Sequence, residues 1–288
     1  MVTSIPRHDY PTDHAAEGLA VLDETAVWVL GELGEPDGVG RAQALSTTLT
    51  LAKSHCAIDP EAVKFETWEA WVTAMQTGSA LFAAASAAEG NTVTVRIKEQ
   101  ERTLPALRPE SPLNAGAWVT SFYLAMICRE NERLTMLAQV PVSLLRDSGA
   151  VFDEYVYSWV EALQSFWSGR QDVGDKLVAA VDGAGPQAVR YADADLVSKI
   201  MYPSMMLLYR AIRRDPSEFN KALADALRAH KAYWTADEDR ALSSDGLVAL
   251  GPLAMACLAR DQGIPVEVES NYLPKALLDY SWAGEIEY

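Results

Sequence analysis

Apolar side chains recur every three or four residues through most of this chain, and this spacing restricts it to a fold built from amphipathic helices. Residues 14–34 form the first such segment, and its apolar residues fall on one helical face. These residues are Leu19, Leu22, Ala26, Val29, Leu30 and Leu33. A second segment runs from Gly38 to Ala57 and carries Leu45, Leu49 and Ala52 on its stripe. The N-terminal part is therefore expected to be helical.

Local signals predict where further helices begin and end. Asp59 and Pro60 are expected to be the N-cap and first residue of a helix that runs towards Ala88. More helices are expected at 115–129, 131–138, 142–147, 153–168, 173–182 and, after a Gly/Pro break, at 196–213, followed by a last helical turn from Pro274. Pro203 should kink or split the helix that contains it. Asp193 and Asp195 are interpreted as helix-start residues.

One pair of helices has especially clear stop and start signals. Arg213 and Arg214 suit a helix C-terminus, where positive charge is favourable. Asp215, Pro216 and Glu218 then provide an N-cap, a first-position proline and a capping acid for the next helix. Because the connection is so short, the two helices must be antiparallel neighbours.

Two segments have the alternation of β-strands. Residues 92–106 predict a hairpin centred near Glu99-Gln100, and residues 266–269 predict a short strand. The fold class is therefore mainly α: an irregular multi-helix bundle or an α-solenoid of antiparallel hairpins, with one small β-hairpin. We expect a single helical domain over 1–288, with a possible subdivision into 1–112 and 113–288 because prolines interrupt 105–112.

The chain is strongly acidic. Its 288 residues include 24 Lys and Arg against 40 Asp and Glu, a formal charge of −16. Residues 1–60 and 229–288 each carry a net −6, whereas 181–228 carry +1. This balance argues against binding to nucleic acid or to an anionic membrane, since both need a basic surface. It fits either a solvated surface or a surface that attracts a basic protein.

The sequence contains no familiar catalytic, nucleotide-binding or metal-binding motif, so we expect no enzyme activity, no cofactor and no metal. The three cysteines, Cys56, Cys128 and Cys257, are far apart and indicate neither disulfides nor zinc. His55 and Cys56 are adjacent on a helix, which points their side chains in different directions, so Cys56 is interpreted as a buried thiol.

His230 and an aromatic segment are the remaining candidates for a site. His230 lies on an apolar stripe with Phe219, Leu223, Leu227 and Trp234, which favours a hydrogen-bonded histidine in or near the core over a metal ligand. Residues 155–167 are rich in aromatics, which favours core packing over a ligand platform. The aromatics are Tyr155, Tyr157, Trp159, Phe166 and Trp167, of which Tyr155, Trp159 and Phe166 fit one buried face.

The first residues, MVTSIPRHDYPTDH, lack the apolar core of a signal peptide, and no apolar run is long enough to span a bilayer. We therefore expect a cytoplasmic protein.

Three C-terminal segments resemble the bacterial family of immunity protein 49. They are CRENERLTMLAQVPVSLLR (128–146), LLYRAIRRDPSEFNKALADALRAHKAYWTADEDR (207–240) and DGLVALGPLAMACLARDQGIPVEVESNYLPKALL (245–278). The resemblance covers roughly residues 120–280. It implies a mostly helical cytoplasmic antitoxin, encoded beside a polymorphic toxin that is in many cases a nuclease. Such a protein would bind its cognate toxin and block it without chemistry, and the resemblance carries over no binding residues.

We expect the contact with a basic toxin to include the acidic turn Asp237-Glu238-Asp239, together with Asp245. Trp234 could anchor this surface, although its apolar stripe favours the core. The alternative is a helical scaffold that binds a peptide or an apolar metabolite between aromatic walls. An enzyme ranks last because no pair of catalytic residues stands out. The oligomeric state and the identity of the toxin stay open.

Overall fold

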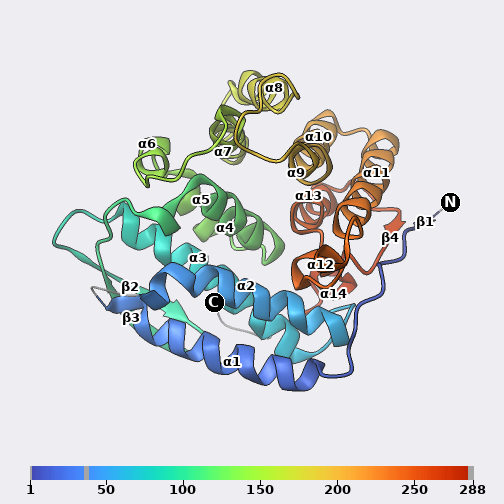
Figure 1. Cartoon of the computed structure of the whole chain (residues 1–288). Helices are drawn as coiled ribbons and strands as arrows, with labels where there is room; N and C mark the ends of the chain where they lie inside the picture. Colours follow the sequence, from blue (N-terminus) through green and yellow to red (C-terminus); the bar gives the residue numbers. More distant parts are fainter. Residues whose placement is uncertain (1, 36–38, 285–288) are drawn as a thin grey trace.

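The computed structural model of the chain describes residues 2–35 and 39–284 (Figure 1). The first part contains β1 (Thr3–Ser4), α1 (Ala15–Gly31), the 3-10 helix η1 (Glu32–Gly34), α2 (Val39–Ile58), α3 (Phe65–Ser86), β2 (Thr92–Ile97), β3 (Gln100–Pro105) and the 3-10 helix η2 (Ser111–Leu113). The middle part contains α4 (Ala115–Ile127), α5 (Asn131–Ala138), α6 (Val142–Arg146), α7 (Glu154–Trp167) and α8 (Val173–Gly183). The last part contains α9 (Ala194–Leu196), the π-helix η3 (Val197–Met201), α10 (Tyr202–Arg213), α11 (Pro216–Trp234), α12 (Glu238–Ala241), the 3-10 helix η4 (Ser244–Leu247), α13 (Leu250–Asp261), β4 (Val268–Glu269) and α14 (Lys275–Asp279).

The predicted fold class is confirmed: the protein is a mainly helical assembly with one small antiparallel hairpin. The helices expected between residues 115 and 183 all form, and their ends lie within two residues of the expected positions. The first expected helix continues from α1 into η1, and its apolar face is buried or half-buried. The second helix is α2, but Gly38, its expected first residue, lies outside the described residues.

One continuous cluster of buried apolar side chains joins the helices from Ile5 to Leu278. Its largest members include Trp68 and Trp71 of α3, Trp118 of α4 and Trp159 of α7. In Figure 1, α1 and α2 lie on one side of the fold and α5 to α8 lie on the opposite side. Helices α10, α11 and α13 lie on a third side, between these two groups. Helices α3 and α4 cross at Gly78, where a Cβ atom would come within 2.4 Å of the Ser121 Oγ.

The expected start of the third helix is wrong. Helix α3 begins at Phe65, six residues after Asp59, and Pro60 is not its first residue. The Asp59 carboxylate instead accepts hydrogen bonds from the backbone N–H groups of Val63 and Lys64 at 3.1 and 2.9 Å, and from the Thr67 hydroxyl at 2.6 Å. Asp59 therefore accepts hydrogen bonds from N–H groups just before α3, although a loop separates it from the helix. A search of the sequence for a capping residue directly before the helix does not find such an acceptor.

Pro203 produces the break expected of it. The chain is helical from Ala194 to Arg213, but it widens into the π-helix η3 immediately before Pro203. A proline has no N–H to donate to the fourth preceding carbonyl, and its ring crowds that carbonyl. A π-helical segment is one of the known ways in which a helix absorbs such an interruption.

The α10–α11 connection also follows the sequence. Helix α10 ends at Arg213, Arg214 adopts a left-handed conformation at φ 52°, and the Asp215 carboxylate accepts the Glu218 N–H at 3.1 Å. Arg210 reaches back to Glu218 with 3.3 Å between Nη2 and Oε2. The two helices are antiparallel neighbours, as predicted. Asp193 likewise caps α9 by accepting the Leu196 N–H at 3.0 Å.

The predicted hairpin pairs Thr92–Ile97 with Gln100–Pro105, so its turn consists of Lys98 and Glu99. The turn lies one residue earlier than expected, and Lys98 takes a positive φ of 55°. The strand expected at 266–269 is β4, which covers only Val268–Glu269 and pairs in parallel with β1. Its partner at the far end of the chain was not predicted, because two residues carry no detectable alternation.

Candidate functional site

Helix α11 presents the predicted apolar stripe to the core. Phe219, Leu223, Leu227 and His230 are buried, and Trp234 at the end of the stripe is half-buried. The ring of His230 hydrogen-bonds through Nε2 to the carbonyl oxygen of Gly246 at 3.0 Å. Burial lowers the pKa of His230 to about 3, so the ring is neutral and donates this bond. The prediction of a hydrogen-bonded core histidine is confirmed.

Trp234 lies where the core meets the surface. Its ring packs against Gly246 so closely that a Cβ atom at this glycine would meet the ring at 2.9 Å. The rings of His230 and Tyr233 flank it, with centroids 6.1 and 5.1 Å away. Its Nε1 is buried without a hydrogen-bond partner among the described residues. Trp234 is therefore held mainly by packing, and only part of its ring is open to a partner.

One carboxylate of the acidic turn after α11, that of Asp237, has a structural role. Asp237 is the N-cap of α12: its carboxylate accepts the Arg240 N–H at 2.8 Å and lies 3.3 Å from the Arg240 Nε. The Arg240 guanidinium also covers the ring of Tyr233, 4.3 Å from its centroid. Glu238 and Asp239 are exposed and form no ion pair within the described part of the chain. These two carboxylates are the ones that a partner can reach without disturbing the turn.

Asp245 has a different environment from the turn. Its Oδ1 lies 2.7 Å from the Nζ of Lys53 on α2. The two side chains differ in exposure, because Asp245 is 53% exposed and Lys53 only 8%. Asp245 thus provides the counter-charge for a buried lysine and joins η4 to α2. The structure therefore divides the predicted acidic site: Asp237 and Asp245 have structural partners, whereas Glu238 and Asp239 have no ion pair with any described residue.

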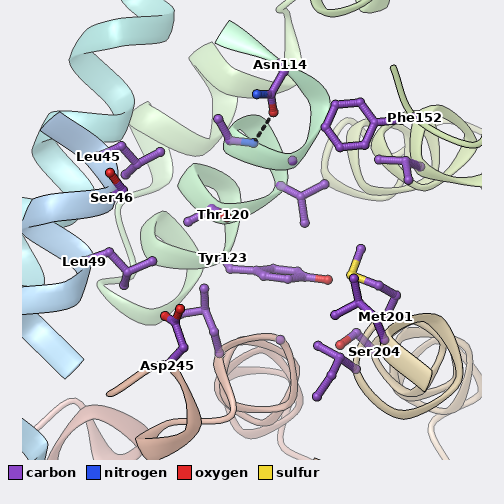
Figure 2. Close-up of a pocket in the computed structure, with 18 of the residues that line it drawn as sticks. Leu45, Ser46, Leu49, Asn114, Thr120, Tyr123, Phe152, Met201, Ser204 and Asp245 are labelled. Atoms are coloured by element: carbon purple, nitrogen blue, oxygen red, sulfur yellow. Dashed lines mark hydrogen bonds between the residues drawn. The ribbon is translucent and has the colours of Figure 1, made fainter. Parts of the chain in front are cut away.

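A cavity of about 820 Å³ lies beside this ion pair, between α2, α4, α10 and α13. Figure 2 shows Leu45 and Leu49 of α2 on one wall, with Met201 and Ser204 on the other. Tyr123 of α4 projects between these walls. Asp245 lies at one end of the cavity and Phe152 at the other. This volume falls in the range of pockets for small ligands.

Hydrogen bonds fix most of the polar groups that line the cavity. The Tyr123 hydroxyl accepts the Trp159 indole N–H at 2.9 Å, and burial raises the pKa of Tyr123 to about 12. The Asp153 carboxylate accepts backbone N–H groups of Arg190, Tyr191 and Ala192. Burial acts to raise the pKa of Asp153, but these hydrogen bonds together lower it by more, so the pKa of Asp153 lies below its usual value. Asp153 thereby anchors the loop that carries the exposed Tyr191 at the cavity wall.

The aromatic segment of α7 serves mainly as core. Tyr155, Tyr157 and Trp159 are buried, and Phe166 and Trp167 are half-buried against the core. Tyr157 is more buried than its helical position predicts because the Arg146 guanidinium covers its ring at 3.9 Å. Only Tyr155 of these five aromatics lines the cavity. The core-packing interpretation is confirmed.

Within the described residues, no group of three or more His, Cys, Asp or Glu side chains is arranged to hold a metal ion. Cys56, Cys128 and Cys257 are all buried free thiols. Burial raises the pKa of Cys56 to about 12 and that of Cys257 to about 11. Such thiols are poor nucleophiles. No helix of the described chain is both long and apolar enough to cross a membrane.

Sequence reasoning missed Lys53 and the cavity. A signal for Lys53 existed: it follows Leu49 by four residues and therefore lies beside the apolar stripe of α2. A charged residue at such a position calls for a buried partner. The cavity itself has no local signal, because its lining comes from residues spread between Arg41 and Pro252.

Fold and site together define an acidic, mainly helical protein with two exposed carboxylates on α12 and a cavity between α2, α4, α10 and α13. The chain belongs to the immunity protein 49 family, whose model matches residues 59–277. This match supports a general role in immunity against a toxin. No curated protein and no solved structure matches the chain.

The family match extends further towards the N-terminus than the resemblance in the sequence, which begins near residue 120. It includes α3 and the hairpin, and it therefore crosses the proline-rich segment at 105–112. Helices α1 and α2 lie outside the matched range.

Proposed function

We propose that this protein is a cytoplasmic immunity protein that neutralises a basic toxin, most simply a nuclease, by binding it in a stoichiometric complex. The observation that carries the proposal is the family match over residues 59–277. The formal charge of −16 supports the choice of a basic partner, since complementary fields accelerate association. A nuclease must present a basic groove to its substrate, and an acidic protein can occupy that groove. The mechanism requires no catalytic residue.

We infer that Glu238 and Asp239 belong to the toxin contact. Both are exposed at the start of α12, and Asp237 holds the backbone of that turn in place. Exposed carboxylates on a fixed backbone can pair with arginine or lysine at a small entropic cost. Asp237 and Asp245 contribute to the negative field, but their first role is structural. Trp234, at the end of α11 just before this turn, is half-buried.

Growth rescue tests this proposal. The chain is co-expressed with candidate toxin domains, starting with the product of the neighbouring reading frame, and survival is scored. Glu238→Lys with Asp239→Lys should weaken the binding of the rescued toxin about ten-fold while leaving the melting temperature unchanged, because each exposed ion pair contributes about 0.2–1 kcal/mol and the reversal adds repulsion. Asp237→Asn is the matched control, since asparagine keeps the cap and should preserve binding.

The cavity favours a second candidate function, the binding of a small apolar ligand or a peptide side chain. Its walls combine aliphatic residues with Tyr123, Phe152 and Tyr155, and polar groups converge near Lys53. Native mass spectrometry of the purified chain would detect a retained ligand. Leu49→Trp should fill the cavity and abolish such a signal, whereas loss of toxin binding by the same variant would assign the cavity to the toxin.

A further inference from the structure

A second hollow, the α1 groove, has a volume of about 670 Å³ and lies on the side of the molecule covered by α1. Helices α1, α2 and α3 and the tip of the β2–β3 hairpin line it. Figure 1 shows α1 along the outer edge of the fold with the hairpin close to it. Thr48 and Leu51 of α2, Ala70 of α3 and Ile97 of the hairpin contribute to its lining.

Negative charge predominates in the α1 groove. Its acidic lining residues are Asp23, Glu66, Glu69 and Glu99. Glu69 alone has an ion pair with a described residue, at 3.6 Å from the Nζ of Lys98. The second cation, Arg102, donates instead to the Leu30 carbonyl at 2.7 Å and to the Gln100 side chain at 2.9 Å. Three carboxylates thus remain without a cationic partner in the described structure.

His55 does not offset this charge. It lines the α1 groove, and burial lowers its pKa, although Asp23 and Glu66 act in the opposite direction. A histidine whose pKa lies below its usual value is neutral at pH 7. The field in the groove is therefore set by the carboxylates, and it favours a cationic occupant.

The outer face of α1 adds large apolar side chains to this acidic surface. Val27 lines the groove and is 61% exposed, whereas Trp28 is 50% exposed on the adjoining face of α1, outside the groove, because successive helical residues point in different directions. Glu24 and Glu32 lie one helical turn before and after Trp28. An exposed indole between two carboxylates is the arrangement that an arginine guanidinium prefers, because it can stack on the ring and pair with the acids. Tryptophan is also the residue type most enriched in interface hot spots.

The α1 groove lies across the N-terminal boundary of the family match. Helices α1 and α2 precede residue 59 and lie outside the matched range, whereas α3 and the hairpin lie inside it. The α1 groove therefore forms between two helices outside the matched range and elements inside it.

We propose that the α1 groove is the docking site for an arginine- or lysine-bearing segment of the toxin, with Val27 as its apolar anchor and Trp28, on the adjoining face of α1, as a second contact outside the groove. The identity of the partner rests on the proposed function. The groove supplies carboxylates that have no cationic partner among the described residues, and the exposed Val27 and Trp28 supply the apolar area that binding buries.

Point variants of α1 test this proposal with the toxin identified by growth rescue. Half of the Trp28 side chain, about 100 Å², remains to be buried, so Trp28→Ala should weaken toxin binding about ten- to a hundred-fold. Val27→Lys should weaken it at least ten-fold because it places a cation in the groove. The matched control is Val178→Lys, where the valine is 59% exposed and belongs to α8, a helix on the opposite side of the fold from α1 in Figure 1. Val27→Lys and Val178→Lys should retain the melting temperature of the parent because both valines are mostly exposed. Trp28→Ala also removes the buried half of the indole, so its binding is measured at a temperature at which the variant is fully folded.

Charge reversals separate this docking site from the acidic turn. Glu66→Lys with Glu99→Lys should raise the dissociation constant at least ten-fold and reduce its salt dependence. Equal binding by the parent and all α1-groove variants would overturn this inference and leave the proposed function intact. If the parent neutralises no basic toxin, the proposed function fails and the docking site fails with it.

Discussion

The ion pair between Lys53 and Asp245 makes a specific prediction about stability. Asp245→Asn removes the charge that faces a lysine only 8% exposed, across an Nζ–Oδ1 distance of 2.7 Å. Breaking a fully buried pair costs about 3–5 kcal/mol, and breaking an exposed pair costs about 0–1 kcal/mol. Because the lysine is buried and the aspartate is 53% exposed, we expect an intermediate loss of about 2 kcal/mol in the free energy of unfolding.

Urea denaturation followed by tryptophan fluorescence measures this loss. With a urea dependence of about 3 kcal/mol per molar, the midpoint should fall by roughly 0.7 M without a change in slope. Lys53→Met removes the buried charge and keeps most of the aliphatic volume. The double variant should therefore be more stable than Asp245→Asn alone, because no unpaired charge remains inside.

Two results would refute this reasoning. One is a midpoint for Asp245→Asn equal to that of the parent, which would mean that the carboxylate does not support Lys53. The other is an additive loss in the double variant, which would mean that the two side chains act independently. A loss of toxin neutralisation by Asp245→Asn at full stability would instead assign this carboxylate to the interface.

Three further predictions follow from buried groups. The pKa of His230 falls from 6.5 in the unfolded chain to about 3 in the folded protein, so between these pH values only the unfolded chain binds a proton at this residue. The free energy of unfolding should therefore fall by about 1 kcal/mol for each unit by which the pH is lowered through this range. The pH dependence of urea midpoints measures this, and an unchanged slope in His230→Gln would contradict it. Gly251→Ala places a Cβ 2.2 Å from the Ser204 Oγ and should destabilise the protein by about 1–3 kcal/mol, with partial recovery in the double variant with Ser204→Ala, as measured by thermal denaturation. A thiol reagent should label none of the cysteines in the native protein at pH 8 and all of them in denaturant, whereas rapid native labelling would disprove their burial; they are Cys56, Cys128 and Cys257.

The sequence predicts those parts of the fold that depend on local rules. Apolar periodicity identifies the helices, and the Asp215-Pro216 cap fixes the α10–α11 turn because its donors and acceptors lie within four residues. Asp59 shows the limit of these rules. Its carboxylate serves N–H groups four and five residues away through a loop, so reading it as an adjacent cap places the start of the helix too early.

The candidate site depends on long-range contacts, and these limit what the sequence can predict. The acidic turn is visible in the sequence, but the partner of Asp245 is Lys53, which is 192 residues away. The pairing of β1 with β4 likewise joins the two ends of the chain. The α1 groove is equally invisible, since α1, α3 and the hairpin must be placed before Asp23, Glu66 and Glu99 are seen to share a surface.

We propose that the protein inhibits a toxin by binding it and leaves the toxin chemically unchanged. Titrating the purified chain into a fixed amount of the active toxin tests this claim most directly. We predict that toxin activity falls linearly to an end point at a fixed molar ratio, and that intact toxin is recovered when the complex is dissociated. Complete inactivation by a small fraction of an equivalent, or a toxin recovered with an altered mass, would show that the protein modifies the toxin chemically instead.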